Sequence, residues 1–371
     1  MSEPIICVDC SPLLVRSAGV KTYLYYLLKS MIEGSPESIR TFLAPRDLER
    51  LNHDGGPRMH PARTALLLAL NKLPEIFCDI AIGRCDVFHS SNMLRTPPGR
   101  PRLTATIHDL TAWILPEFHT PATVTVDSIF AKNILKRAAG LIAVSENTKR
   151  DAVKILGLSP ERIRVIPLGI PPSYSNVSRD SVGRVVAKYN LRRPWFLFIG
   201  TIEPRKNVDT LLAAWRSLPD FVAREHELLI VGMPGWRSEA TMAALREANR
   251  GNWGIRYLGY VPEGDLPALT SGARAFVYPS LYEGFGIPVA QAMAAGCPVI
   301  TSNVSSLPEV TGGAALLIDP RSVSELGTAL RKLIESPELG SQLASAGVEK
   351  ARKYTWTAAA EKTLEFFREI A

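Results

Sequence analysis

The sequence predicts an α/β protein made of two doubly wound domains. Its 371 residues exceed the length over which a single hydrophobic core usually grows, so about two domains are expected. Apolar runs typical of buried parallel strands alternate with helical stretches in both halves of the chain. Each half also contains a strand followed by a glycine-bearing turn and a helix, the unit from which doubly wound sheets are built.

The composition excludes several classes of protein. Hydrophobic residues make up 46% of the chain and charged residues 21%, fractions that exclude disordered and fibrous proteins. The net charge of +7 suits an anionic ligand or an anionic lipid surface, but the basic residues form no cluster interleaved with aromatics, which argues against nucleic acid. The five cysteines and the absence of a secretory apolar segment indicate a cytoplasmic chain with free thiols. Cys7 and Cys10 fall in and directly after a buried strand, which favours a structural role over a metal or redox site.

The first domain is expected over residues 1–172. Its first strand is predicted from Pro4 to Asp9, and a loop ending in Gly19 leads into a helix that begins at Val20. This order of strand, glycine loop and helix is typical of the start of a Rossmann-like unit.

A short, strongly apolar helix is predicted from Thr64 to Ile76, after an exposed loop from Asn52 to Pro61. One interpretation is that this helix packs in the core. The other is that, with Arg58 and Arg63 upstream, it lies in a membrane interface and brings the protein to a lipid-linked ligand.

Two histidines follow predicted strands of the first domain. His108 lies at the carboxyl end of the strand that begins at Thr104 and is followed by Asp109. Ligands of open α/β sheets bind beyond the carboxyl ends of the strands, so His108 is a candidate ligand contact. For His89, which ends the preceding strand, a structural role is favoured.

A proline-rich and polar stretch is predicted as a linker over residues 173–190, followed by a second domain over residues 191–354. Its first strand leads to Arg205 and Lys206, directly before a helix that begins at Val208. Cations at a helix N-terminus oppose the helix dipole. A bound diphosphate would remove this conflict, and the alternative is a solvated pair of side chains that tolerates it.

A second strand, turn and helix lies near residue 284. The buried strand from Ala275 to Tyr278 ends in a turn with Glu283, Gly284 and Gly286, and Pro288 suits the start of the helix that follows. Helix N-termini expose unpaired N–H groups and glycines permit close approach, so the turn favours a diphosphate. Glu283 would accept hydrogen bonds from hydroxyls of the same ligand. The alternative is a structural turn without a ligand, common in α/β proteins.

The segment EGFGIPVAQAMAAGCPVITSNVSSLPEV resembles the signature of retaining GT-B glycosyltransferases of family 4, in which two glutamates are separated by seven residues. The first glutamate corresponds to Glu283, which the resemblance places on hydroxyls of the donor sugar. The second position, on the ribose, is Gln291 here. Because hydrogen bonds to charged groups are stronger than those to neutral ones, we expect a ribose contact weaker by roughly 1 kcal/mol, or about fivefold in affinity.

Two further segments resemble the same family. TIHDLTAWILPEF is similar to the segment whose histidine faces the donor sugar, which implies that role for His108. GTIEPRKNVDTLLAAW is similar to the signature whose Lys and Arg hold the diphosphate, although Thr201 stands where many members carry an arginine. The catalytic candidates are therefore His108 and Glu283, and the donor-binding candidates are Gly19, Arg205, Lys206, Tyr260, Val261, Glu283, Gly284, Phe285, Gly286 and Gln291.

The resemblance covers nearly the whole chain and implies a GT-B architecture, with two Rossmann-like domains facing a cleft and a helix in residues 355–371 that crosses back to the first domain. It implies a hexosyltransferase of polysaccharide or lipopolysaccharide assembly that acts with retention on a glycan or polyprenyl-linked acceptor, with peripheral contact to the inner face of the cytoplasmic membrane. GDP-mannose is the first expected donor and a UDP-sugar the second. No Asp-x-Asp motif occurs, so activity is expected without a metal or another cofactor. A GT-B-like epimerase or phosphorylase and a non-catalytic nucleotide-sugar binder are the alternatives.

Overall fold

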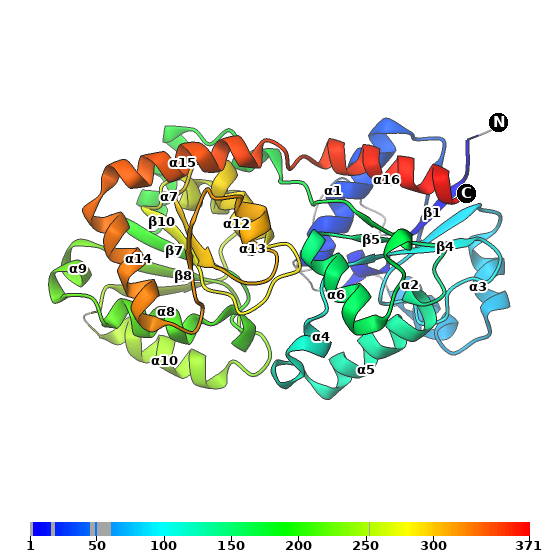
Figure 1. Ribbon diagram of the computed structural model, residues 1–371, viewed down its shortest axis with the longest axis horizontal. Helices are drawn as coiled ribbons and strands as arrows, with labels where there is room; N and C mark the ends of the chain where they lie inside the picture. The colour runs from blue at the N-terminus through cyan, green and yellow to red at the C-terminus, as the bar shows by residue number, and fades with distance from the viewer. Residues whose placement is uncertain (1–2, 16–18, 45–48, 50–60, 252) are drawn as a thin grey trace. The chain divides into compact units, whose positions relative to one another are not determined.

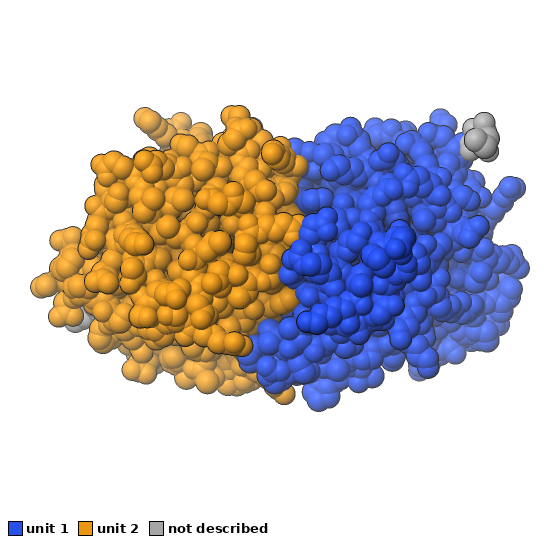
Figure 2. Space-filling view, viewed as in Figure 1, with its two compact units in different colours: residues 1–169, 355–371 blue, residues 170–354 orange. Residues whose placement is uncertain are grey.

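The computed structural model describes residues 3–15, 19–44, 49, 61–251 and 253–371. The chain forms two compact units, coloured separately in Figure 2. Unit 1 comprises residues 1–169 and 355–371, and unit 2 comprises residues 170–354. Each unit is a parallel sheet covered by helices, as predicted for a doubly wound α/β protein (Figure 1).

Within the described residues, the sheet of unit 1 has six parallel strands in the order β2-β1-β3-β4-β5-β6. The strands are β1 (Ile6–Asp9), β2 (Ile39–Phe42), β3 (Val87–Ser90), β4 (Arg102–Ile107), β5 (Gly140–Ala143) and β6 (Ile163–Val165). The α-helices are α1 (Gly19–Gly34), α2 (Pro61–Leu70), α3 (Glu75–Ile82), α4 (Thr111–Ile114), α5 (Pro121–Phe130), α6 (Glu146–Leu156) and α16 (Trp356–Ile370). Strands β1, β3 and β5 are buried at every position, which explains why each begins with apolar residues or glycine, and β1 and β3 end in buried polar residues.

Helix α16 packs against α1 and completes unit 1 (Figure 1). Thr355 begins the helix, because its hydroxyl accepts a hydrogen bond of 3.1 Å from the backbone N–H of Ala358. Two glycines permit its close approach. A Cβ atom at Gly169 would lie 2.4 Å from the nitrogen of Trp356, and one at Gly140 would lie 2.6 Å from Cδ1 of Ile370.

The sheet of unit 2, in the part of the chain that the structure describes, has six parallel strands in the order β12-β11-β10-β7-β8-β9. The strands are β7 (Trp195–Ile199), β8 (Glu227–Val231), β9 (Ile255–Gly259), β10 (Ala275–Tyr278), β11 (Val299–Ser302) and β12 (Leu316–Ile318). The α-helices are α7 (Arg179–Lys188), α8 (Val208–Arg216), α9 (Asp220–Glu225), α10 (Glu239–Arg250), α11 (Leu266–Ser271), α12 (Ile287–Ala294), α13 (Leu307–Thr311), α14 (Val323–Glu335) and α15 (Pro337–Ala351).

Each sheet has one point at which the chain reverses the direction in which it adds strands. In unit 1 this point lies between β1 and β3, and in unit 2 between β7 and β10. Loops leave such a pair of strands in opposite directions and open a crevice at their carboxyl ends, which is where ligands bind in this class of fold. The loops after β1, β3, β7 and β10 therefore position any site.

Two predicted segments differ from the structure. The segment 173–190, predicted as a linker, contains α7 and belongs to unit 2, because Ser178 caps the helix and α7 packs against α11. The single helix predicted from Thr64 to Ile76 is instead the pair α2 and α3, and the chain turns before Pro74. A loop was predicted from Asn52 to Pro61. Its residues before Pro61, which include Arg58, lie outside the described residues.

Candidate functional site

A cluster of four charged side chains occupies the crevice position of unit 2. Glu203, Arg205 and Lys206 lie in the loop after β7, and Glu283 lies in the turn after β10. The adjacent strands β7 and β10 bring these two loops together, although 77 residues separate Lys206 from Glu283. All four side chains are nearly buried, with exposed fractions of 2% to 12%.

Glu283 is the centre of the cluster. Its Oε1 accepts hydrogen bonds of 2.6 Å from Lys206 Nζ and 2.7 Å from Ser280 Oγ, and its Oε2 lies 2.9 Å from Arg205 Nη1. Arg205 also contacts Glu203, since Nη2 donates to Oε1 over 2.7 Å. Lys206 Nζ donates a further hydrogen bond of 2.6 Å to the hydroxyl of Tyr278.

The electrostatics of the cluster keep Glu283 ionised. Burial alone would raise the pKa of Glu283, but the charges of Arg205 and Lys206 outweigh it and lower the pKa to about 2. Burial raises the pKa of Glu203, and its Oε2 is a buried atom with no hydrogen-bond partner among the described residues.

The alternative of a solvated pair is wrong for Arg205 and Lys206, because both side chains are nearly buried and each is paired with a carboxylate. Glu203 and Glu283 supply one negative charge for each cation. The binding of a diphosphate by these cations stays a prediction. The cluster is neutral as a whole, and it holds the two cations in fixed positions.

The turn after β10 presents backbone rather than side chains. Gly286 caps α12 with φ of 96°, and a Cβ atom there would lie 2.7 Å from Cδ2 of Leu307. Ser306 Oγ lies 2.9 Å from the carbonyl oxygens of Glu283 and Phe285, which fixes the turn. The ring of Phe285 is buried against Tyr354, with centroids 5.3 Å apart, so Phe285 offers a ligand only its backbone.

The other predicted donor-binding residues lie on other elements. Tyr260, directly after β9, is 53% exposed, whereas Val261 is buried. Gln291 lies on α12, eight residues after Glu283, and its side chain is half-buried. In unit 1, Gly19 is the first residue of α1, and a Cβ atom added there would meet no atom within 4 Å.

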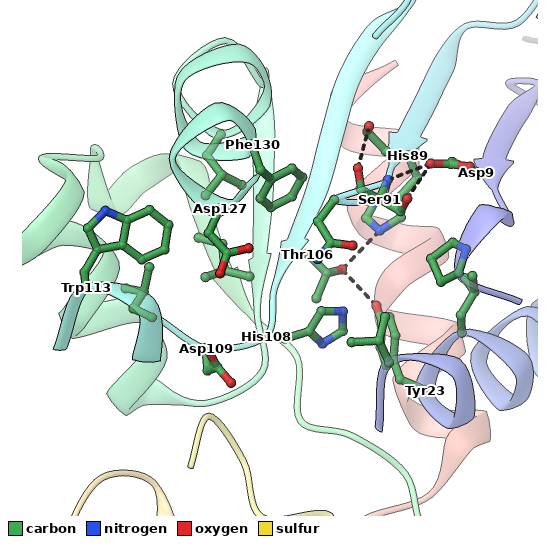
Figure 3. A pocket seen from close by; sticks show the side chains of 18 residues that line it. Asp9, Tyr23, His89, Ser91, Thr106, His108, Asp109, Trp113, Asp127 and Phe130 are labelled. Carbon is green, nitrogen blue, oxygen red and sulfur yellow. Dashed lines mark hydrogen bonds between the residues drawn. The ribbon is translucent and has the colours of Figure 1, made fainter. Parts of the chain in front are cut away.

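Unit 1 contains a pocket of 170 Å³ at the carboxyl ends of β1, β3 and β4 (Figure 3). Asp9, His108 and Asp127 line it, together with the rings of Tyr23 and Trp113. The buried carboxylate of Asp9 accepts a hydrogen bond of 2.5 Å from Ser91 Oγ, which joins the loops after β1 and β3. Burial first, and the charge of Asp109 second, raise the pKa of Asp127 to about 6.

His108 directs an uncharged ring into this pocket. Burial lowers the pKa of His108 to about 4, against the opposite effect of Asp109. Its ring packs edge-on against Tyr23, with centroids 4.7 Å apart. Neither ring nitrogen has a hydrogen-bond partner among the described residues, so both are available to a ligand. Asp109 instead contacts the first residue of α4, because its Oδ1 accepts hydrogen bonds of 3.1 and 2.7 Å from the backbone and hydroxyl of Thr111.

His89 has a structural environment, as predicted. Its Nδ1 lies 3.0 Å from Thr104 Oγ1 and its Nε2 lies 3.0 Å from Thr106 Oγ1. Thr104 donates to a backbone carbonyl, so it accepts from Nδ1–H, and Nε2 accepts from Thr106. Thr106 then accepts a 2.8 Å hydrogen bond from the hydroxyl of Tyr23. The chain of hydrogen bonds fixes Tyr23, and with it the ring that His108 packs against (Figure 3).

The buried histidines make the protein sensitive to mild acid. The folded-state pKa of His89 is lowered to about 3, chiefly by burial, whereas an unfolded chain binds the proton near its ordinary value of 6.5. The contribution of His89 to the free energy of unfolding is therefore fully present above about pH 6.5. It decreases as the pH falls below this value, with a slope that approaches about 1.4 kcal/mol per pH unit. His89→Gln should show a shallower loss than the wild type when unfolding by urea is compared at about pH 7 and about pH 5. Equal slopes would contradict this assignment.

Several residues of the charged cluster in unit 2 and of the pocket in unit 1 were not predicted from the sequence. Glu203 belongs to the cluster, and Tyr278 and Ser280 contact it. Glu203 could have been found by balancing the charges of Arg205 and Lys206 within the four residues from Glu203 to Lys206. The pocket residues Asp9, Tyr23 and Asp127 carry no comparable local signal, because the fold alone brings them together.

Comparisons with known proteins agree with the resemblance. The family described as "Glycosyltransferase Family 4" matches residues 17–174, and "Glycosyl transferases group 1" matches residues 184–350. O-antigen chain mannosyltransferase B of Escherichia coli is 32% identical over 283 residues, which make up 76% of this chain and 74% of that protein.

Two solved structures have the same fold. Sucrose-phosphate synthase from Thermosynechococcus elongatus superimposes with a TM-score of 0.75 and 22% identity over 99% of both chains. HepE of Anabaena, in complex with UDP-glucose, has a TM-score of 0.73 and 15% identity over 99% of this chain and 100% of that one. At these identities the likeness shows the fold alone, and it confirms the predicted GT-B class.

Proposed function

Since the chain belongs to family 4 of the glycosyltransferases, we propose that it transfers mannose, with retention, from a nucleotide-diphosphate sugar to a glycan or polyprenyl-linked acceptor. The observation that carries the proposal is the buried cluster of Arg205, Lys206 and Glu283 at the crevice position of unit 2. Mannose is favoured because the relative with 32% identity is a mannosyltransferase.

Lys206 and Arg205 are proposed to hold the diphosphate of the donor. An ammonium group has three donor hydrogens, and the hydroxyl of Tyr278 and Glu283 accept two of those on Lys206. The third remains for a phosphate oxygen. As the glycosidic bond breaks, negative charge builds up on the leaving diphosphate, and donors that are already held in place stabilise it without reorganisation.

Glu283 is proposed to bind hydroxyls of the donor sugar. A carboxylate has about four lone-pair sites, and Lys206, Ser280, Arg205 and the hydroxyl of Tyr278 all contact that of Glu283. A hydroxyl of the donor sugar would share or replace one of these contacts. His108, for its part, presents a neutral ring that can donate one hydrogen bond and accept another, which suits an uncharged sugar.

A UDP-sugar is the second candidate donor, because the HepE structure contains UDP-glucose. Tyr260 and Val261 are the candidates for contact with the base and do not by themselves distinguish guanine from uracil.

Within the described residues, no group of three or more metal-ligating side chains is present. In the same part of the chain, no helix is both long and apolar enough to cross a bilayer. Activity without a divalent metal is part of the proposal because the sequence has no Asp-x-Asp motif, and it needs its own measurement.

A thermal-shift screen with GDP, UDP, ADP and their sugars tests the donor. A ligand that binds only the folded protein raises stability by about 2.7 kcal/mol at a hundred times its dissociation constant. We expect the largest shift with GDP and GDP-mannose, and transfer from GDP-mannose that persists in EDTA. A shift only with UDP or ADP would contradict the mannose assignment, and activity abolished by EDTA and restored by magnesium would contradict metal independence. Binding without any turnover would favour a non-catalytic binder.

A further inference from the structure

The helices α2 and α3 of unit 1 expose an almost entirely apolar face. Every exposed residue between positions 61 and 82 is apolar, except Lys72. Ile80 is 68% exposed, Leu68 58%, and Phe77 45%. The face, named here the α2–α3 face, consists of Pro61, Ala62, Ala65, Leu66, Leu68, Ala69, Leu73, Pro74, Ile76, Phe77, Ile80 and Ala81. Large contiguous apolar patches are rare on soluble proteins and mark interaction sites.

Polar side chains of these helices point inward and hold the pair in place. Asp79 is buried, and its Oδ1 accepts hydrogen bonds of 3.1 Å from the backbone N–H groups of Gly99 and Arg100. Asn71 accepts from the backbone N–H of Arg95 over 2.7 Å. Only Leu67, Leu70 and Cys78 are buried in the hydrophobic core. The polarity is inverted relative to an ordinary surface helix, with an acid inside and large apolar side chains outside.

Exposed cations lie next to the helices α2 and α3. Lys72 lies between them, Arg84 follows α3 by two residues, and the backbone N–H groups of Arg95 and Arg100 donate to Asn71 and Asp79. Lys72, Arg84, Arg95 and Arg100 are exposed, and none of them has an ion pair among the described residues. The carboxylates of the two helices are engaged elsewhere: Glu75 is paired with Arg137, and Asp79 is buried. Asp86, four residues after α3, is exposed and accepts a hydrogen bond from the backbone of Ile5. The basic charges therefore predominate around the apolar side chains.

We propose that the α2–α3 face docks on an anionic lipid surface. Apolar side chains bordered by unpaired Lys and Arg suit the boundary between acyl chains and negatively charged headgroups. A neutral protein partner or a second copy of the chain would bury the same apolar side chains but would leave the cations without counter-charges. The structure thus refines the two interpretations of this segment, since Leu67 and Leu70 pack in the core while their neighbours face outward.

Co-flotation of the full-length protein with lipid vesicles tests the proposal. We expect binding to vesicles of phosphatidylcholine mixed with phosphatidylglycerol, and at least tenfold weaker binding to pure phosphatidylcholine. Phe77→Glu/Ile80→Glu should reduce binding to the mixed vesicles at least tenfold, because it places two carboxylates in the apolar region. Lys72→Gln should reduce it about fivefold, the effect of one basic residue near an anionic surface.

The matched control is Ile155→Glu/Phe221→Glu, which makes the same change at two exposed apolar residues elsewhere, 37% and 47% exposed. It should bind like the wild type. The thermal shift with GDP should be the same in all these variants, because none alters the charged cluster, and this also shows that they are folded.

Failure of the wild type to bind the mixed vesicles, or unchanged binding by Phe77→Glu/Ile80→Glu, would overturn the proposal. A wild-type dimer that this variant makes monomeric would overturn it in favour of a second copy. Vesicle binding needs no donor, so these results are independent of the proposed transfer reaction.

Discussion

Glu283→Gln is expected to lower the rate of sugar transfer by about 10²–10³, the usual effect of losing one preorganised electrostatic contact in an active site. The glutamine amide keeps the shape of the side chain but removes the charge that fixes Lys206 and Arg205 at 2.6 and 2.9 Å. The loss should appear in kcat at saturating donor. Steady-state kinetics with GDP-mannose and a glycan acceptor would measure it.

A control must separate this effect from lost stability, because removing one partner of a buried ion pair typically destabilises by about 3–5 kcal/mol. Glu227 provides that control. It is also buried and paired, 2.9 Å from Arg193 Nη2 and 3.1 Å from Arg256 Nη1. It lies at the amino end of β8, whereas the cluster follows the carboxyl ends of β7 and β10. Glu227→Gln should lower the melting temperature and leave kcat unchanged. If both variants lose rate equally, Glu283 has no direct role in transfer.

Lys206→Met is expected to weaken the binding of a nucleoside diphosphate by about 10–100-fold. A hydrogen bond to a charged group contributes about 1.5–3 kcal/mol, which corresponds to that range. Methionine has a similar length and volume, and Glu283 retains its contacts with Arg205 and Ser280, so the cluster stays partly neutralised. Isothermal titration with GDP would measure the change.

Lys188→Met is the comparison for Lys206→Met. Lys188 forms an ion pair of 2.5 Å with Asp265, but its side chain is 53% exposed and it lies on α7. Exposed pairs contribute at most about 1 kcal/mol, so this variant should bind GDP like the wild type. An unchanged affinity in Lys206→Met would exclude Lys206 from the diphosphate site, and a loss in both variants would point to a general effect of net charge.

Much of the fold could be predicted because its signals are local. Continuous apolar runs identify buried parallel strands, and the residue directly after such a run lies at the ligand-binding edge of the sheet, which is how His108 was found. Lys206 was found because cations before a helix N-terminus oppose the helix dipole, and Glu283 because it lies in a glycine-bearing turn before a helix. Their roles toward a donor stay predictions.

What could not be predicted depends on contacts between distant parts of the chain. The ion pair of Lys206 with Glu283 spans 77 residues, and no pattern near Lys206 indicates it. The segment 173–190 has the composition of a linker, yet burial of Val185 makes it a packed helix. In the α2–α3 face, hydrophobicity alone could not say which leucines would be buried, because that depends on where Asn71 and Asp79 anchor the helices.

Helix α16 also has a consequence for the order in which the protein can fold. Residues 355–371 are synthesised only after all of unit 2, yet they belong to unit 1. Until they emerge, α1 lacks its covering helix, and the ring of His89 lacks Phe367, whose centroid lies 5.2 Å away. Unit 2 is contiguous in the chain and can close first. A chain cut short at residue 354 would therefore carry a finished second unit and an open first one, in which residues next to the His108 pocket are still exposed to water.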